Sequence, residues 1–92
     1  MKIEFNYKKS IKNKRDPSRG FGLEHAVSLD WNAAVTLEDT RRDYRERRYI
    51  TYGMIEGRLF VMVWTPRGGK CRVISLRKAN QKERKLYEEE IA

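Results

Sequence analysis

The sequence has few residues that could form cross-links or hold a metal ion. Its 92 residues include one cysteine, Cys71, and one histidine, His25. One cysteine cannot form a disulfide within the chain, and this pair is too small for a zinc site. No stretch approaches the roughly 18 apolar residues of a membrane-spanning helix, and the opening "MKIEFNYKK" has no apolar signal segment. We therefore expect no metal or other cofactor, no membrane partner and a cytoplasmic location.

The chain also lacks internal repeats, low-complexity tracts and linkers. A chain of 92 residues, 39% of them hydrophobic, can fill one modest core. We therefore expect a single domain over residues 1–92.

Basic residues, in contrast, are abundant. Lysine and arginine total 21 against 13 acidic residues, which gives a formal net charge of +8. A small basic domain attracts polyanions, nucleic acid first among them. An acidic protein partner, or a charge that only keeps the protein soluble, are the alternatives.

The hydrophobic pattern predicts five strands and three helices. A short strand over residues 2–6 precedes a helix over 7–15 that Asn6 can cap, and a second short helix covers 23–31. A strand over 33–39 and a polar loop over 39–47 lead into three strong strands, 48–55, 58–65 and 70–77. Asn80 and Glu83 have the spacing of a capping box for a final helix from residue 81.

This order favours an α+β fold: a single antiparallel β-sheet with α-helices packed on one face. The other face would be open, and RNA can lie on an open face of a basic protein. In the strand over 70–77, strict alternation places Arg72 and Arg77 on opposite faces.

The basic residues form three groups. The first lies on the first helix and the loop after it: Lys8, Lys9, Lys12, Lys14, Arg15 and Arg19. The second lies in the polar loop and just beyond it: Arg41, Arg42, Arg45, Arg47 and Arg48. The third is spread over the hairpins and the final helix: Arg58, Arg67, Arg72, Arg77, Lys78 and Arg84. Arginine grips phosphate with a planar fork. The alternatives are a solvated helix face, a loop with internal ion pairs, and surface charges at strand edges.

These residues suit one kind of chemistry better than others. No serine–histidine–aspartate set is available, and we interpret His25 as structural. Glu88, Glu89 and Glu90 are consecutive on a helix and point in different directions, which indicates a solvated helix end rather than a metal site. RNA can be cut through its own 2′-OH, with arginines neutralising the charge that builds on the phosphate. Glu46 or Tyr87 could act as base if its environment shifted its pKa toward neutrality.

Four segments, "ERRYITYG", "GRLFVMVWT", "RGGKCRVISLRKAN" and "ERKLYEEE", resemble the BrnT-like toxin family. The pattern Arg72-x-Ile74-Ser75-x-Arg77-x-Ala79-x(3)-Glu83-Arg84-x(2)-Tyr87 carries most of the resemblance. The resemblance as a whole is loose over Met1 to Glu90 and close over Glu46 to Glu90. Two places depart from the family pattern: Arg19-Gly20 stands where relatives have Lys-His-Gly, and Asn6-Tyr7 stands where they often have Asp-Pro.

The resemblance implies a RelE-like fold and a metal-independent RNA endonuclease that inhibits translation within a type II toxin–antitoxin system. It implies a cognate BrnA-like antitoxin with a ribbon-helix-helix part, operator DNA bound only through the antitoxin complex, and a toxin dimer within that complex as a further expectation. The family's active residues are arginines with an acidic partner. Carried over to this chain, the expected catalytic residues are Glu46, Arg58, Arg67 and Arg77, and the expected RNA-binding residues are Arg48, Arg72, Lys78, Arg84 and Tyr87.

Two other functions remain open from the sequence. A non-catalytic module would hold RNA or an antitoxin on the basic sheet without cutting anything. A DNA-binding regulator is the other alternative, although the chain shows no helix-turn-helix pair.

Overall fold

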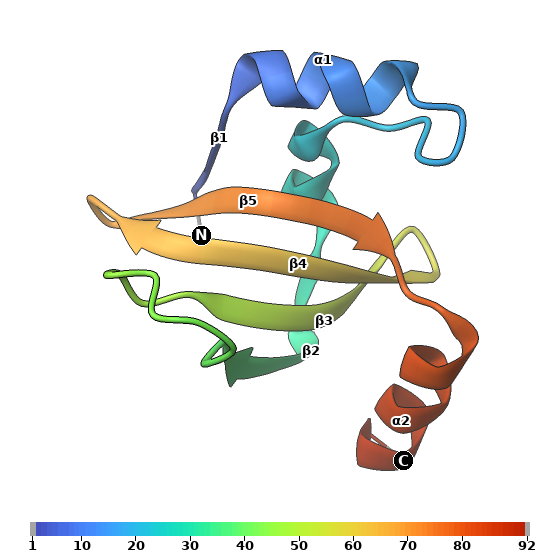
Figure 1. The fold of residues 1–92 in the computed structure, drawn as a ribbon. Helices are drawn as coiled ribbons and strands as arrows, with labels where there is room; N and C mark the ends of the chain where they lie inside the picture. The colour runs from blue at the N-terminus through green and yellow to red at the C-terminus, as the bar shows by residue number, and fades with distance from the viewer. Residues whose placement is uncertain (1, 92) are drawn as a thin grey trace.

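A computed structural model describes residues 2–91 and arranges them as a five-stranded sheet with helices around it (Figure 1). In chain order the elements are β1 (Ile3–Phe5), α1 (Tyr7–Arg15), the 3₁₀ helix η1 (Leu23–Ser28), β2 (Asp30–Glu38), β3 (Tyr49–Ile55), β4 (Arg58–Arg67), β5 (Lys70–Lys78) and α2 (Gln81–Ile91). The strand order across the sheet is β1-β5-β4-β3-β2. The central meander, the helix over 7–15 and the helix from residue 81 are therefore confirmed.

The sheet is mixed, so the prediction of a purely antiparallel sheet is wrong. The four strands β2 to β5 pair antiparallel, but β1 runs parallel to β5, with Ile3 opposite Cys71 and Phe5 opposite Val73. The backbone N–H of Cys71 donates to the carbonyl of Lys2 at 2.8 Å. This direction follows from long-range packing, because Ile3 and Phe5 join the core beside β5, and no local pattern encodes it.

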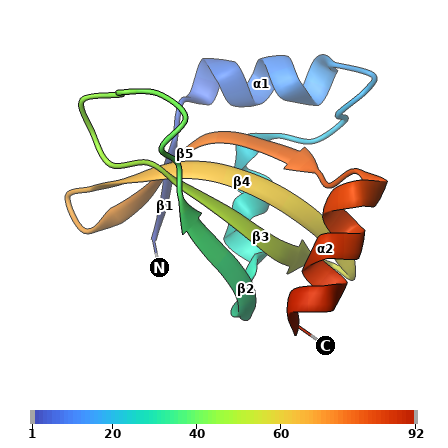
Figure 2. The same ribbon diagram turned by 60° about the horizontal axis from the view of Figure 1, so that its bottom comes forward.

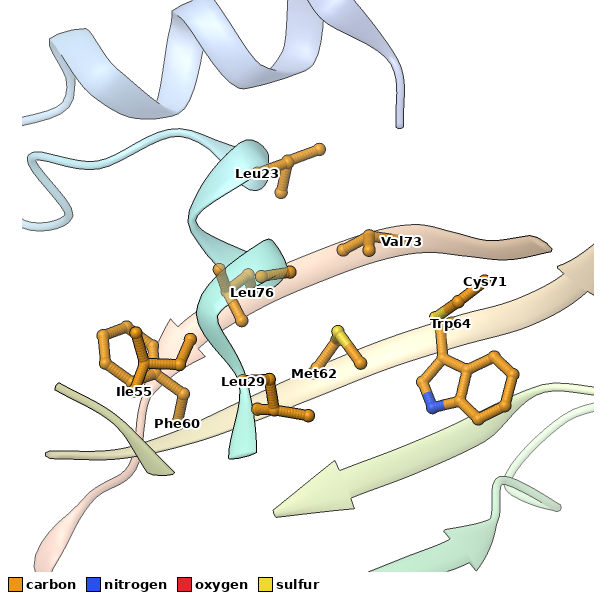
Figure 3. Packing of buried hydrophobic residues seen from close by; sticks show 10 residues of the cluster. Leu23, Leu29, Ile55, Phe60, Met62, Trp64, Cys71, Val73 and Leu76 are labelled. Carbon is orange, nitrogen blue, oxygen red and sulfur yellow. The ribbon is translucent and has the colours of Figure 1, made fainter. Parts of the chain in front are cut away.

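One face of the sheet, which we call the buried face, carries the main hydrophobic core. Phe60, Met62 and Trp64 of β4 alternate along the strand toward this face, as the period of two requires. Leu23, Ala26 and Leu29 from η1 and its C-cap cover them, and Figure 3 shows Leu23 and Leu29 above the strands.

The second helix is shorter than predicted and of a different type. The sequence suggested a helix over 23–31 with Leu23, Ala26 and Val27 buried. In a 3₁₀ helix residues three apart align, so Leu23, Ala26 and Leu29 face the core and Val27 is 68% exposed. The chain enters β2 at Asp30, and Trp31 packs edge-on against Trp64, with ring centroids 5.8 Å apart.

The opposite face, which we call the open face, is covered only at one end. There, Leu59, Val61 and Ala79 form a second cluster with Tyr87 of α2. Figure 2 shows α2 against this end of the sheet, on the opposite side from η1, with the β2–β3 loop at the other end. The prediction that all helices pack on one face is therefore wrong. The part of the open face between α2 and that loop holds the candidate site.

Candidate functional site on the open face

A β-bulge in β5 places Arg72 and Arg77 on the same face, contrary to the sequence prediction. The pairing of β4 with β5 shifts register between Val63 and Trp64, so that Ser75 pairs with Val63 but Val73 pairs with Trp64. The extra residue, Ile74, reverses the alternation. Arg72 consequently lies opposite Thr65 and Arg77 opposite Val61, both on the open face.

The open face is organised in rows that run across the strands. Its middle row is Ile50, Val63 and Ser75, all partly exposed. On one side of this row lie Thr65 and Arg72, and Arg48 extends the same row because it precedes Ile50 by two positions. On the other side lie Tyr52, Val61 and Arg77. Adjacent rows are about 7 Å apart, so the three arginines border a patch with a largely apolar floor.

Arg77 is held in place by the capping residue of α2. Its Nη1 and Nη2 atoms donate to the two carboxylate oxygens of Glu83, each at 2.7 Å. Glu83 also accepts from the backbone N–H of Asn80 at 2.9 Å, and Asn80 Oδ1 accepts from Glu83 N at 2.8 Å. The predicted capping box is thus confirmed, and it shares its carboxylate with Arg77. These hydrogen bonds raise the pKa of Arg77 and lower that of Glu83.

The hydrogen bonds to Glu83 leave one edge of the Arg77 guanidinium open. A guanidinium has five N–H donors in two forks. The end fork binds Glu83, and a weaker contact of 3.4 Å joins Nη1 to the Lys78 carbonyl. Among the described residues, Nε and the second Nη2 hydrogen have no acceptor. This side fork matches the spacing of two phosphate oxygens, and the side chain is 46% exposed.

Glu4 of β1 holds the arginines at the opposite edge. Arg72 Nη1 lies 2.6 Å from Glu4 Oε1, and Arg67 Nη1 lies 3.9 Å from the same oxygen. No pattern along the chain pointed to this carboxylate, because it comes from the parallel strand β1. One carboxylate shared by two arginines leaves that edge with a surplus of positive charge.

The β2–β3 loop contains the internal ion pairs that were one alternative for its arginines. Arg41 forks onto the buried carboxylate of Asp39, with both hydrogen bonds at 2.8 Å, and this pairing keeps the pKa of Asp39 well below its usual range. Glu46 Oε2 accepts from Arg48 Nε at 2.9 Å, and the Arg48 guanidinium stacks 4.1 Å from the centre of the Tyr44 ring. The loop therefore fixes Arg48 at the border of the open face.

Four predicted site residues lie outside the patch that the three arginines border. Arg58 is nine positions from Arg67 on β4, a separation of about 30 Å along a strand, so the two cannot act on one phosphate. Lys78 pairs with Phe60, whose ring lies on the buried face. Arg84 donates to the carbonyl of Ala79 at 3.1 Å. The Tyr87 ring packs in the second cluster, and its hydroxyl donates to the carbonyl of Ala33 in the irregular part of β2.

Two cations that the prediction left out of the site lie beside it, at the edge of β5. Lys9 Nζ donates to the carbonyl of Ile74, and Arg19 Nη1 donates to that of Leu76 at 3.3 Å. They cover the part of the β5 edge that β1 does not pair. Burial, followed by the charges of Arg19 and Arg48, lowers the pKa of Lys9.

Two other reactive side chains have structural roles. His25 packs between aromatic rings, with centroids 5.7 Å from Phe21 and 5.4 Å from Phe60, as the sequence suggested. Cys71 is fully buried, and burial raises the pKa of its thiol to about 12. Within residues 2–91, no three histidine, cysteine, aspartate or glutamate side chains gather as metal ligands would, and no helix is long and apolar enough to cross a membrane.

The fold and the open face define a small α+β protein that presents a basic, arginine-bordered sheet surface. Comparison with protein families shows that the chain belongs to the family of BrnT, the ribonuclease toxin of type II toxin–antitoxin systems, whose family model matches residues 5–83. Searches of the curated proteins and of the solved structures found no match.

Membership in this family confirms the resemblance seen in the sequence. A type II toxin–antitoxin system implies an antitoxin partner, and the family's description as a ribonuclease toxin supports RNA endonuclease activity. The expected likeness to RelE stays a prediction. So do the individual site residues, although the geometry now separates Arg77, Arg72 and Arg48 from the others.

Proposed function

We propose that this protein is a metal-independent RNA endonuclease that cuts RNA laid across the open face, with Arg77 as the residue that neutralises the scissile phosphate. The observation that carries this proposal is the state of the Arg77 guanidinium. Glu83 holds one fork at 2.7 Å, and the other fork has no acceptor among the described residues. Preorganised donors of this kind contribute strongly to catalysis because they need no rearrangement when charge develops.

The reaction uses the substrate's own nucleophile. The RNA 2′-oxygen attacks the adjacent phosphorus and loses its proton, the bond from phosphorus to the 5′-oxygen breaks, and that oxygen takes up a proton. The products are a 2′,3′-cyclic phosphate and a 5′-hydroxyl. The protein contributes orientation of the strand and stabilisation of the negative phosphorane-like charge.

The other arginines of the patch bind RNA phosphates on one side of the scissile phosphate. Arg72 and Arg48 lie one row beyond the Ile50–Val63–Ser75 floor, on the side opposite Arg77. Arg67 and Glu46 support this row through the ion pairs with Glu4 and Arg48. Arg58, Lys78, Arg84 and Tyr87 lie outside the patch, and we assign them no contact with the scissile phosphate.

In the cell, this activity would be held in check by a partner. The family implies an antitoxin, and we propose that it has a BrnA-like ribbon-helix-helix part that represses the operon as a complex with this protein. Cleavage of RNA by the free toxin would then inhibit translation. Expression of the chain alone should stop growth, and co-expression of the antitoxin should restore it.

Incubation of the purified protein with an RNA oligonucleotide in the presence of EDTA tests the mechanism. We expect cleavage to continue and the upstream product to carry a 2′,3′-cyclic phosphate. An oligonucleotide with 2′-deoxyribose at the cut position should resist, because its nucleophile is missing. Loss of cleavage in EDTA, or a product ending in a 3′-hydroxyl, would contradict the proposal.

A further inference from the structure

A second basic site lies outside the open face, along α1. Helical spacing places Lys9, Lys12 and Asn13 on one side of this helix. With Arg15, Asp16 and Arg19 they line an open groove beside the β5 edge. Four of these residues are cations and one is an acid. The Asp16 carboxylate is turned toward its own loop, where Oδ1 accepts from the Ser18 backbone N–H at 2.9 Å and from its hydroxyl at 2.7 Å.

The groove has an unmet hydrogen-bond donor beneath it. Asn13 is 8% exposed, and its side-chain Nδ2 has no acceptor among the described residues. A buried donor without a partner destabilises the free protein, so an oxygen atom that reaches it would be stabilising. Lys12 and Arg15, on the rim, are exposed and form no ion pair within the described part of the chain.

The composition of the groove indicates the ligand. All of its lining residues are polar or charged, whereas a protein partner is usually anchored by apolar or aromatic side chains in a desolvated pocket. Exposed lysines and arginines around an amide donor suit a phosphate group of a nucleic acid backbone.

The groove is also next to the open face. Lys9 and Arg19, which line it, donate to the carbonyls of Ile74 and Leu76, on either side of Ser75 in β5. We infer that the α1 groove binds a phosphate of the same RNA strand that crosses the open face, where the strand passes over the β5 edge. This inference rests on the proposed function and gives the RNA a second, non-catalytic contact.

Binding of RNA that cannot be cut tests the inference. The probes are two fully 2′-O-methylated oligoribonucleotides, one long enough for the open face only and a longer one, and the readout is fluorescence anisotropy at several salt concentrations. We expect Lys12→Ala/Arg15→Ala to bind the short probe as the wild type does and the long probe more weakly. For the long probe, the slope of log affinity against log salt should fall by about 0.7, the value for one phosphate that is no longer neutralised by the groove.

Two further variants separate binding from folding. Asn13→Asp keeps the shape of the side chain but replaces the free donor with an acceptor among cations. It should remain folded, as urea unfolding checks, and lose affinity for the long probe only. Lys85→Ala, which removes an exposed charge from α2, should leave the affinity and the salt slope for both probes unchanged.

The possible results separate the groove from the active site. If the double variant binds the long probe like the wild type while RNA is still cut, the inference is wrong and the proposed function stands. If the double variant instead loses binding of poly-glutamate and keeps that of RNA, the groove serves an acidic protein and the inference is likewise overturned. If the wild type neither binds nor cuts RNA, both the inference and the proposed function fail.

Discussion

Arg77 and Glu83 form one unit in which a helix cap positions a strand residue. Asn80 and Glu83 satisfy free backbone groups at the start of α2, and the same carboxylate fixes the guanidinium that faces the open sheet. Folding of the helix and placement of the arginine are therefore linked. In the proposed mechanism Glu83 is a positioning residue, because it would act through Arg77 and not on RNA.

The change Glu83→Gln separates these two roles. Glutamine can still accept the Asn80 N–H, but it offers Arg77 one oxygen in place of two. We expect RNA cleavage to slow by about tenfold, since small losses of alignment are costly. RNA affinity should be equal or higher because a negative charge is gone. Single-turnover rates and anisotropy on the same RNA check this, and parallel losses of rate and affinity would contradict it.

At the scale of elements, one polar cluster joins α1 to η1. The Glu24 carboxylate accepts from the Ser10 hydroxyl and pairs with Lys14, while Ser10 Oγ accepts from the Leu23 backbone N–H at 2.9 Å. The hydrogen bonds from Lys14 and Ser10 lower the pKa of Glu24 from its ordinary 4.5 to about 2. The cluster fastens the basic helix over the 3₁₀ helix, and thus beside the sheet.

The Glu24 shift predicts a defined pH dependence. Because the folded-state pKa is below the unfolded-state value, the stabilisation is complete above pH 4.5 and is lost as the pH falls toward 2. Urea unfolding should show a fall in stability over this range that is smaller in Glu24→Gln. If the wild type and the variant lose stability in parallel below pH 4.5, this pairing does not contribute to folding.

The packing of η1 on β3 depends on a glycine. A Cβ atom on Gly53 would lie 2.8 Å from Leu29 Cδ1 and 3.1 Å from its Cγ. Gly53→Ala should therefore destabilise the protein by about 1–3 kcal/mol through overpacking, as measured by urea unfolding. In a Leu29→Ala background the same change should cost much less, because the obstacle is gone. An equal loss of stability in both backgrounds would show that Leu29 is not the obstacle to a side chain at position 53.

Local signals in the sequence were sufficient for much of the fold. The capping spacing of Asn80 and Glu83 and the Glu56–Gly57 turn depend on neighbours along the chain, and both are found, with φ of 49° at Glu56 and 77° at Gly57. The parallel pairing of β1, the position of α2 on the open face and the bulge at Ile74 depend on distant parts of the chain. The pattern of residues within a single strand therefore does not predict these three features.

The same division holds for the candidate site. Arg77 could be singled out from the sequence because its strand meets the helix there. The placement of Arg72 on the same face as Arg77 could not be predicted, because a single extra residue in β5 reverses the side-chain alternation. Glu4, Lys9 and Arg19 come to the site from β1, α1 and the following loop, so only the three-dimensional arrangement reveals them.

At the scale of the whole molecule, the arrangement of the layers decides where the positive charge is exposed. The core and η1 occupy one side of the sheet, α2 covers one end of the other side, and the rest of that side is bordered by arginines. With a net charge of +8, the molecule attracts polyanions, and the proposed function places the scissile phosphate at the free fork of Arg77 on the open face.

The rate at which Arg77→Ala cuts RNA in a single turnover tests the role of this arginine most directly. We predict a fall of about 100-fold or more relative to the wild type, the usual loss when a preorganised donor to the transition state is removed. Lys85→Ala, which removes a charge on the outer side of α2, should cut at the wild-type rate. Cleavage by a folded Arg77→Ala protein at the rate of Lys85→Ala would contradict a catalytic role for the open face.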